Sequence, residues 1–330
     1  MSASQSLTLR VQALRYEARG IVSIELRDPA GATLPAYGPG AHIDLHLDNG
    51  LVRSYSLCGA PEVRDRYTVG VLLDRNSRGG SRFVHEQLRV GATLQVAAPR
   101  NNFELDESAA HTVLVAGGIG VTPIVCMARR LGELGKSFTL VYCARSRAEA
   151  AFIDDLTARH GDAVRVHFDD EAGAPPDLAA MLAGQPADTH FYCCGPGPML
   201  NAFEAACAGH GYANVHIERF AADPSTEAVQ EGEYTVSLAR TGSNVKVPSG
   251  KSLLDALLDA GIEVEYSCRE GVCGSCETAV IEGCPDHRDS VLSSSERATN
   301  KTMMVCVSGC KGNRLVMDLR ESHPRPHKET

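Results

Sequence analysis

The chain has 330 residues, enough for two or three domains that each bury a core. Its 41 acidic residues outnumber its 32 basic ones, and this net charge of -9 argues against a nucleic-acid partner, because phosphate contacts need basic patches. The first ten residues are polar and no long apolar stretch follows, so the sequence predicts neither a secretory leader nor a membrane span. We expect a cytoplasmic monomer whose twelve cysteines are reduced.

The N-terminal third of the chain has short segments of alternating polarity, separated by turns rich in Gly, Pro and Asp. The strands predicted from this alternation are residues 7–14, 21–26, 42–47, 67–73 and 93–97. Strands of this length and spacing are typical of a small antiparallel β-barrel. We assign this predicted barrel to residues 1–104.

Two segments that we place in loops of the barrel suit a flavin. Arg53-Ser54-Tyr55-Ser56 offers a guanidinium, an aromatic ring and two hydroxyls. In Arg78-Gly79-Gly80-Ser81, two glycines let consecutive N–H groups converge on an anion before a helix predicted over residues 81–88. An ordinary turn is the alternative for a lone Gly-Gly pair. Together the segments favour a flavin phosphate, and a complete cradle for a terminal phosphate favours FMN over FAD. Further cofactor contacts are predicted at Val71, Leu72 and Leu73.

From residue 112 onward, apolar strands alternate with helical segments, which predicts a doubly wound parallel sheet in residues 105–220. The predicted strands are residues 112–116, 138–143, 164–168, 190–194 and 215–217, and the predicted helices are residues 123–134, 148–160, 177–182 and 198–209. Such sheets bind their ligands at the carboxyl ends of the strands.

Two of these strand ends predict a site for a pyridine nucleotide. Gly117-Gly118-Ile119-Gly120-Val121-Thr122-Pro123 opens a helix, with Thr122 as the expected N-cap, and suits a pyrophosphate. The full G-x-G-x-x-G pattern is absent, so a purely structural turn stays the alternative. Cys194-Gly195-Pro196 follows a strand at the same edge, and Cys194 is a candidate for the hydride path, although a buried structural cysteine is the common alternative. Arg145 and Arg147 leave the choice between NADH and NADPH open.

Cys268, Cys273 and Cys276 have the C-x4-C-x2-C spacing of a plant-type 2Fe-2S cluster. Such a cluster needs a fourth thiolate. We predict Cys306, at the end of a strand expected over residues 303–307, because a strand end holds a ligand more rigidly than a turn does. The competitors for the fourth position are Cys284 and Cys310. A structural zinc site lacks its second cysteine or histidine pair here, and a redox-active CxxC lacks its helix N-terminus.

The surrounding segments complete a ferredoxin-like domain, which we assign to residues 233–330. Residues 221–232 are polar and predict an interdomain linker. The elements expected after it are a hairpin of residues 233–238 and 245–248, a helix over residues 252–260, and closing strands at residues 278–281 and 303–307. The cluster loop follows the helix directly.

With these three parts placed, residues 7–319 resemble the family of phthalate dioxygenase reductases and vanillate O-demethylase reductases. The resemblance implies an FMN-binding barrel, an NADH-binding domain and a C-terminal ferredoxin. It also implies that Phe220 lies near the flavin and that Cys306 is the fourth cluster ligand. Catalytic roles are expected for Cys194, Thr122 and Phe220.

The function implied by the resemblance is transfer of a hydride from NADH to FMN, followed by single-electron transfer through the cluster to a Rieske-type oxygenase. A flavin suits the middle position because it exchanges both electron pairs and single electrons. Two alternatives stay open at this point. One is a reductase for a haem monooxygenase, and the other is a ferredoxin-type carrier that does not itself oxidise NADH.

Overall fold

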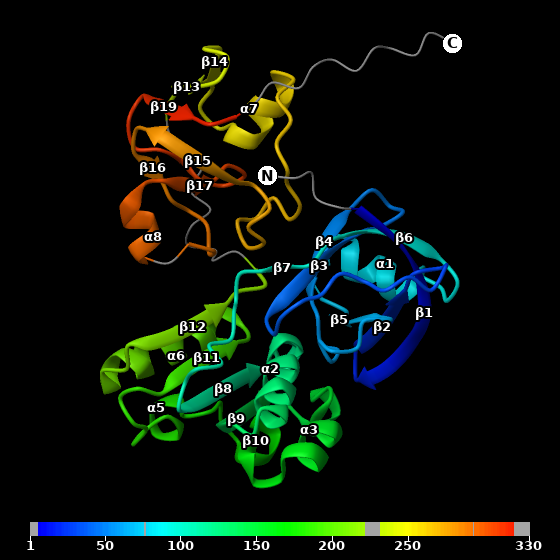
Figure 1. Cartoon of the computed structure of the whole chain (residues 1–330). Coiled ribbons are helices and arrows are strands. Elements are labelled where there is room, and N and C mark those ends of the chain that lie inside the picture. The colour runs from blue at the N-terminus through cyan, green and yellow to red at the C-terminus, as the bar shows by residue number, and fades with distance from the viewer. Residues whose placement is uncertain (1–5, 76, 222–231, 293, 320–330) are drawn as a thin grey trace. The chain divides into compact units, whose positions relative to one another are not determined.

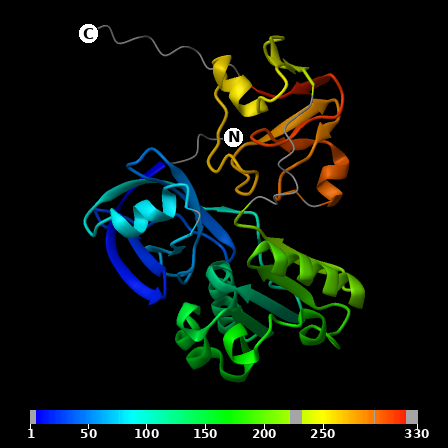
Figure 2. The ribbon, with the colours of Figure 1, turned by 180° about the vertical axis from the view of Figure 1, so that it is seen from behind.

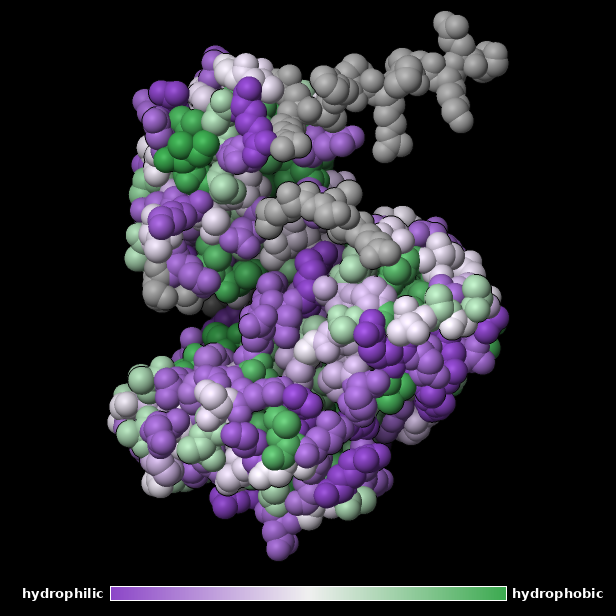
Figure 3. All heavy atoms as spheres, in the orientation of Figure 1, coloured by the Kyte–Doolittle hydropathy of each residue, from purple (hydrophilic) through white to green (hydrophobic). Residues whose placement is uncertain are grey.

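The computed structural model describes residues 6–75, 77–221, 232–292 and 294–319. The chain divides into two compact units, Met1–Phe220 and Ala221–Thr330 (Figures 1 and 2). The predicted linker, residues 221–232, lies outside the described residues except at its two ends. Within the described ranges, no helix has the length and apolar character to cross a membrane. Figure 3 shows hydrophobic side chains scattered among polar ones on the visible face.

The first sheet of unit 1 is antiparallel. Its strands are β1 (Ser6–Ala18), β2 (Ile21–Arg27), β3 (Ala41–His46), β4 (Val52–Ser56), β5 (Tyr67–Leu72), β6 (Thr93–Ala97) and β7 (Arg100–Asn101). They follow the order β4-β3-β6-β1-β2-β5, with β7 beside β3. Side chains such as Leu9, Ile24 and Val69 form its core, and the short helix α1 (Gly80–Glu86) follows β5.

The edges of this sheet, β4 and β5, meet at one isolated bridge between Leu57 and Val69. In the described part of the chain, the predicted barrel is therefore a curled antiparallel sheet without a full closing ladder. A second difference concerns Arg53-Ser54-Tyr55-Ser56, which lies in strand β4 and not in a loop. These residues pair one by one with β3, for example Ser54 with Asp44.

The second sheet of unit 1 confirms the predicted parallel fold. Its strands are β8 (His111–Gly117), β9 (Ser137–Ala144), β10 (Val164–Phe168), β11 (His190–Cys194) and β12 (Asn214–Glu218), in the order β10-β9-β8-β11-β12. The helices α2 (Val121–Glu133) and α3 (Ile153–His160) pack on one face, and α5 (Leu178–Met181) and α6 (Gly197–His210) pack on the other. A one-turn helix, α4 (Asp169–Ala172), follows β10. This order puts the topological switch point between β8 and β11.

Two of the helices that pack on this sheet begin at residues other than those predicted. Gly118–Gly120 forms a 3-10 turn, so α2 begins at Val121 after Gly120 as its N-cap, and Thr122 lies inside the helix. Thr122 Oγ1 instead donates a hydrogen bond to the carbonyl of Ile119, at 3.0 Å. Helix α3 begins at Ile153, five residues later than predicted, because Phe152 has a left-handed backbone with φ of 61°.

The described part of unit 2 has a five-stranded mixed sheet and a two-stranded one. The elements are β13 (Tyr234–Leu238), β14 (Asn244–Val247), α7 (Leu253–Asp259), β15 (Glu277–Glu282), β16 (Pro285–Asp286), α8 (Ser294–Thr299), β17 (Thr302–Met304), β18 (Gly309–Cys310) and β19 (Arg314–Met317). The larger sheet has the order β14-β13-β19-β15-β17, and β16 pairs with β18. Ser252 caps α7 by accepting a hydrogen bond from the Asp255 N–H.

The last cysteine of the predicted cluster set is not at a strand end. Strand β17 ends at Met304, and a turn follows in which the N–H of Ser308 donates to the carbonyl of Met304, at 2.9 Å. Cys306 lies in this turn. The turn is nevertheless held firmly, because the side chain of Cys306 is 7 % exposed and its neighbour Val305 is fully buried.

Candidate redox sites

The two predicted flavin segments meet where the side chain of Arg53 contacts the backbone of Gly80. A Cβ at this position would lie 2.7 Å from Cγ and 2.8 Å from Nε of Arg53, so the Arg53 side chain covers the backbone at the start of α1. The preceding residue, Gly79, has a φ of 103°, which a side chain at that position would strain. Segments 25 residues apart thus form one cradle that combines a guanidinium with a glycine backbone. This donor set suits a phosphate.

The loop that leads into this cradle is held by serine hydroxyls. Ser81 Oγ donates to Ser77 Oγ at 2.9 Å and accepts a hydrogen bond from the N–H of Asp74 at 3.2 Å. Ser77 Oγ in turn accepts a hydrogen bond from the N–H of Gly79. These bonds tie Asp74, Ser77 and Gly79 to the start of α1.

The other residues of the two segments lie in different surroundings. Ser54 Oγ donates to Asp44 at 2.5 Å, and Tyr55 is half-buried. Burial raises the pKa of Asp44, but Arg100 at 2.6 Å and Ser54 outweigh it and hold this pKa below its usual value. Val71 is buried in the core of the sheet, whereas Leu72 and Leu73 are partly exposed. A role of Ser54 or Val71 at the cofactor therefore stays a prediction.

The two glycine turns at the switch point pack against each other. A Cβ at Gly120 would lie 2.2 Å from the carbonyl oxygen of Cys194, and one at Gly117 would lie 2.4 Å from Sδ of Met199. Both glycines therefore have a packing role. Gly118, by contrast, has a φ of 54° and no atom near its would-be Cβ, so its backbone faces open space. The turn can thus accept a ligand over Gly118 while Gly117 and Gly120 hold it in place.

A trio of two buried residues, Ser56 and Cys194, and the partly buried Glu218 connects the parallel sheet to the first sheet. Glu218, at the end of β12, lies 3.4 Å from Ser56 Oγ of β4 and 3.9 Å from Cys194 Sγ at the end of β11. Burial raises the pKa of the Glu218 carboxyl to about 8, so this group holds a proton at neutral pH. Burial also raises the pKa of the Cys194 thiol, which is therefore not a thiolate.

Sequence reasoning assigned no role to Glu218. Its one sequence signal was a carboxylate at the end of the last strand of a parallel sheet, where ligands bind. The methyl group of Thr122 lies against Gly70 of β5. A Cβ built on Gly70 would lie 2.7 Å from this methyl carbon. Phe220 is 41 % exposed, and Arg145 is exposed.

The protonated state of Glu218 has a consequence for stability. Its folded pKa of about 8 exceeds its ordinary value of 4.5, so between these pH values the folded protein binds the proton that the unfolded chain has lost. The contribution of this group to stability is therefore complete below pH 4.5 and declines as the pH rises to about 8. Glu218→Gln should flatten this decline, measured as urea midpoints across the pH range. Glu86→Gln, at an exposed helical site, should leave the pH profile unchanged.

The four predicted cluster cysteines of unit 2 interact with one another. Contact with Cys273 and then Cys306 lowers the pKa of Cys268, and contact with Cys306 lowers the pKa of Cys276. The opposite shift occurs at Cys306, where contact with Cys268 raises the pKa of the thiol. The competing thiols point elsewhere: Cys284 Sγ contacts Asn300 Oδ1, and Cys310 Sγ contacts the carbonyl of Arg314.

The backbone of the loop fits the wrapping of a cluster. The N–H of Glu270 donates to Cys268 Sγ at 3.3 Å, and Ser275 Oγ lies 3.2 Å from Cys273 Sγ. Gly271 has a φ of 68°, and a Cβ there would lie 2.5 Å from Cγ2 of Val307. The loop therefore presses against the turn that carries Cys306. Hydrogen bonds to the sulfurs are the contacts that tune such clusters.

Comparison with known proteins agrees with this arrangement. Residues 236–311 match the 2Fe-2S iron-sulfur cluster binding domain, and residues 94–217 match the N-terminal domain of dimethylamine monooxygenase subunit DmmA-like proteins. The chain is 50 % identical over 324 residues to the phenoxybenzoate dioxygenase subunit beta of Ectopseudomonas oleovorans, covering 97 % of this chain and 100 % of that protein. The crystal structure of phthalate dioxygenase reductase matches with a TM-score of 0.71 and 38 % identity, over 95 % of this chain and 98 % of that one.

The chain belongs to the phthalate dioxygenase reductase family. It is therefore an oxidoreductase with a 2Fe-2S cluster, a flavin and an NADH site. These comparisons confirm the fold, the enzyme class and the cofactors that the sequence predicts. An intact type IV self-sufficient cytochrome P450 monooxygenase is also similar, with a TM-score of 0.87 and 42 % identity over 95 % of this chain. This chain spans only 41 % of that P450.

The residues of this family member fit the groups that it binds. The four neighbouring thiols, with the N–H of Glu270 donating to Cys268 Sγ and the Ser275 hydroxyl beside Cys273 Sγ, have the chemistry that holds a 2Fe-2S cluster. The cradle places the Arg53 guanidinium against the glycine backbone at the start of α1, a donor set that suits the phosphate of a flavin. The ligand roles of individual residues stay predictions, which the variants described below test.

Proposed function

We propose that this reductase takes a hydride from NADH onto FMN and passes single electrons through its 2Fe-2S cluster to a Rieske-type oxygenase that hydroxylates or demethylates aromatic substrates. The observation that carries the proposal is the trio of Ser56, Cys194 and Glu218, which joins the sheet with the phosphate cradle to the sheet with the glycine turns. The full-length similarity to a phenoxybenzoate dioxygenase subunit supports an aromatic oxygenase as partner.

Each part of the chain has a proposed task. Arg53, Tyr55 and the segment Arg78-Gly79-Gly80-Ser81 hold FMN, and Phe220 covers its ring. The turn of residues 117–123, together with Cys194-Gly195-Pro196, orients the nicotinamide dinucleotide. When bound, FMN supplies the exchange between a two-electron donor and a one-electron acceptor. Cys268, Cys273, Cys276 and Cys306 hold the cluster. We assign residues 1–104 to the flavin domain, 105–220 to the nucleotide domain and 233–330 to the ferredoxin domain.

The protein groups around the hydride path are uncharged. Glu218 is protonated at neutral pH, and the Cys194 thiol keeps its proton because burial opposes its ionisation. These groups thus exclude water and orient the reactants without placing a negative charge beside the incoming hydride. NADH is preferred over NADPH, as the family implies; the exposed pair of Arg147 with Asp154, at 2.6 Å, is consistent with this choice but too weak to decide it.

Anaerobic addition of NADH to the purified protein tests the proposed function. Bleaching of both the flavin and the cluster absorbance is the result expected of a reductase. No bleaching would instead indicate a carrier that receives its electrons elsewhere. Electron delivery to a purified Rieske oxygenase, compared with delivery to a haem monooxygenase, then distinguishes the two kinds of partner. The similarity to part of a self-sufficient P450 is the observation that favours the second.

Replacement of Cys194 tests the proposed hydride path. We expect Cys194→Ala to slow flavin reduction by NADH by about tenfold, since a misplaced reactant loses orientation. Stopped-flow absorbance of the flavin measures this rate, and the cluster absorbance should stay intact. Cys193→Ala is the matched control, because Cys193 is equally buried but packs on the opposite face of the sheet, with Phe203 and Leu200. An unchanged rate in Cys194→Ala would reject its role.

A further inference from the structure

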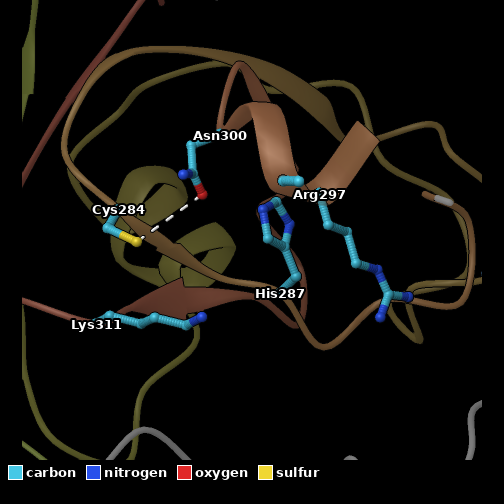
Figure 4. Close-up of a pocket in the computed structure, with 6 residues that line it drawn as sticks. Cys284, His287, Arg297, Asn300 and Lys311 are labelled. Atoms are coloured by element: carbon cyan, nitrogen blue, oxygen red, sulfur yellow. Dashed lines mark hydrogen bonds between the residues drawn. The ribbon is translucent and has the colours of Figure 1, made fainter. Parts of the chain in front are cut away.

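The ferredoxin-like unit contains a cavity of about 380 Å³ that the proposed function does not use (Figure 4). The residues that line it are Cys284, His287, Arg297, Ala298, Asn300 and Lys311. They come from the segment around β16, from α8 and the turn after it, and from the residue that follows β18. In the view of Figure 4, the His287 ring lies between the side chains of Lys311 and Arg297.

Buried polar atoms at this cavity lack partners. The side chain of His287 is 7 % exposed, and neither of its ring nitrogens has a hydrogen-bond partner among the described residues. Nε of Arg297 is likewise buried and unpartnered within that part of the chain. Buried polar groups in proteins are nearly always hydrogen-bonded, so three such atoms beside one cavity indicate a ligand that supplies acceptors.

The charge of the lining favours an anion over a metal ion. Arg297 and Lys311 are cationic, and none of the six lining residues is acidic. The carboxylate of Asp289 lies 3.8 Å from both His287 Nδ1 and Arg297 Nη2, and Arg297 Nη2 also donates a hydrogen bond to the Asp289 carbonyl. The same carboxylate accepts hydrogen bonds from the N–H groups of Val291 and Leu292, so Lys311 is the cation of the lining that has no acidic partner within the described ranges. The two cationic side chains of the lining disfavour a metal ion at Cys284 and His287, whereas they attract a phosphate or a carboxylate.

We propose that this cavity is a binding site for a small oxyanion, in which Arg297 and Lys311 supply the charge and His287 and Asn300 supply hydrogen bonds. Phosphate and carboxylate groups share this chemistry. Cys284 provides a local reporter, because it is the one exposed cysteine of the twelve, all of which lie in the described ranges. Its thiol lies at the rim beside Asn300. An anion in the cavity should therefore shield it.

The test uses the full-length protein with its flavin and cluster bound, so that the FMN phosphate site is filled. The rate at which iodoacetamide alkylates Cys284 is followed by peptide mass spectrometry, with inorganic phosphate in one arm and succinate in the other. Chloride at equal ionic strength is the reference. We expect phosphate, succinate or both to slow the alkylation severalfold, and the more effective arm identifies the preferred anion.

Two variants tie the protection to the cavity. Arg297→Gln and Lys311→Gln should each raise the half-protecting anion concentration by about tenfold, because a charge-assisted contact is lost. Lys246→Gln removes the same charge at an exposed strand residue outside the cavity, and should behave as the wild type. Cluster absorbance checks that each variant is folded. The proposal is overturned if neither anion slows alkylation, or if protection is unchanged in Lys311→Gln.

Discussion

The Cys306→Ser protein is expected to lose the visible absorbance and the low-temperature paramagnetic signal of the reduced 2Fe-2S cluster, while NADH still bleaches its flavin. The reason is that Cys306 contacts both Cys268 and Cys276, one from each end of the loop. The competing thiols of Cys284 and Cys310 instead contact Asn300 and the carbonyl of Arg314. Removing even an outer contact of a metal site costs about 10- to 100-fold in affinity, so loss of a direct ligand should exceed this. Reduction of an added one-electron acceptor such as cytochrome c should fall correspondingly, because the proposed electron path leaves the protein through the cluster.

The matched controls are the two competing cysteines. Cys310→Ser replaces a thiol that accepts a hydrogen bond from the N–H of Gly312 at 3.3 Å, and Cys284→Ser replaces an exposed one. Both variants should keep the cluster. If Cys310→Ser lost the paramagnetic signal and Cys306→Ser retained it, the ligand assignment would be wrong, although the family membership would stand.

The second large effect is expected from Gly80→Val. Its new Cβ would lie within 2.8 Å of Arg53 Nε and would push the guanidinium out of the phosphate cradle. A hydrogen bond to a charged group contributes roughly 1.5–3 kcal/mol, so the FMN dissociation constant should rise by about 10- to 100-fold. Titration of the apoprotein with FMN, followed by quenching of flavin fluorescence, measures this constant.

Gly209→Val provides the matched control for this prediction. A Cβ at Gly209, in α6, meets no atom within 4 Å, and its backbone needs no positive φ. Its FMN affinity should therefore equal that of the wild type. The cluster signal of Gly80→Val should persist, since the cluster lies in the separate unit 2. Tight FMN binding by Gly80→Val would remove Arg53 and Gly80 from the cofactor site.

Elements with a strong local signal could be predicted from the sequence. β6, β10 and β11 have the predicted bounds, because each is a short segment of strand-forming residues, alternating in polarity in β6 and β10 and largely apolar in β11. β4 was missed because Arg53-Ser54-Tyr55-Ser56 is polar, and its pairing with β3 comes from tertiary structure. β19 was missed because its four residues follow a turn and gain their place only between β13 and β15.

The candidate sites also divide into those that a local sequence pattern predicts and those that form only in the folded protein. The cysteine spacing predicts a cluster because the ligands lie close together in the sequence, and the glycine turns predict strand ends for the same reason. The role of Glu218 depends on a contact with Ser56, which is 162 residues away, and on burial that raises its pKa. Neither feature is visible in the local sequence, because both arise only in the folded protein. The meeting of Arg53 with Gly80 is likewise a property of the folded sheet.

The bond between Ser56 and Glu218 also limits how such reductases can exchange modules by recombination. A chimaera that joined the N-terminal sheet of this chain to the nucleotide domain of another would keep the bond only if the donor's last parallel strand also ended in a carboxyl group. The chimaera would also need a glycine at position 70 if the donor has a threonine as the second residue of α2, because a side chain at position 70 would collide with the methyl group of that threonine. Successful grafts should therefore carry these matched pairs across the junction together.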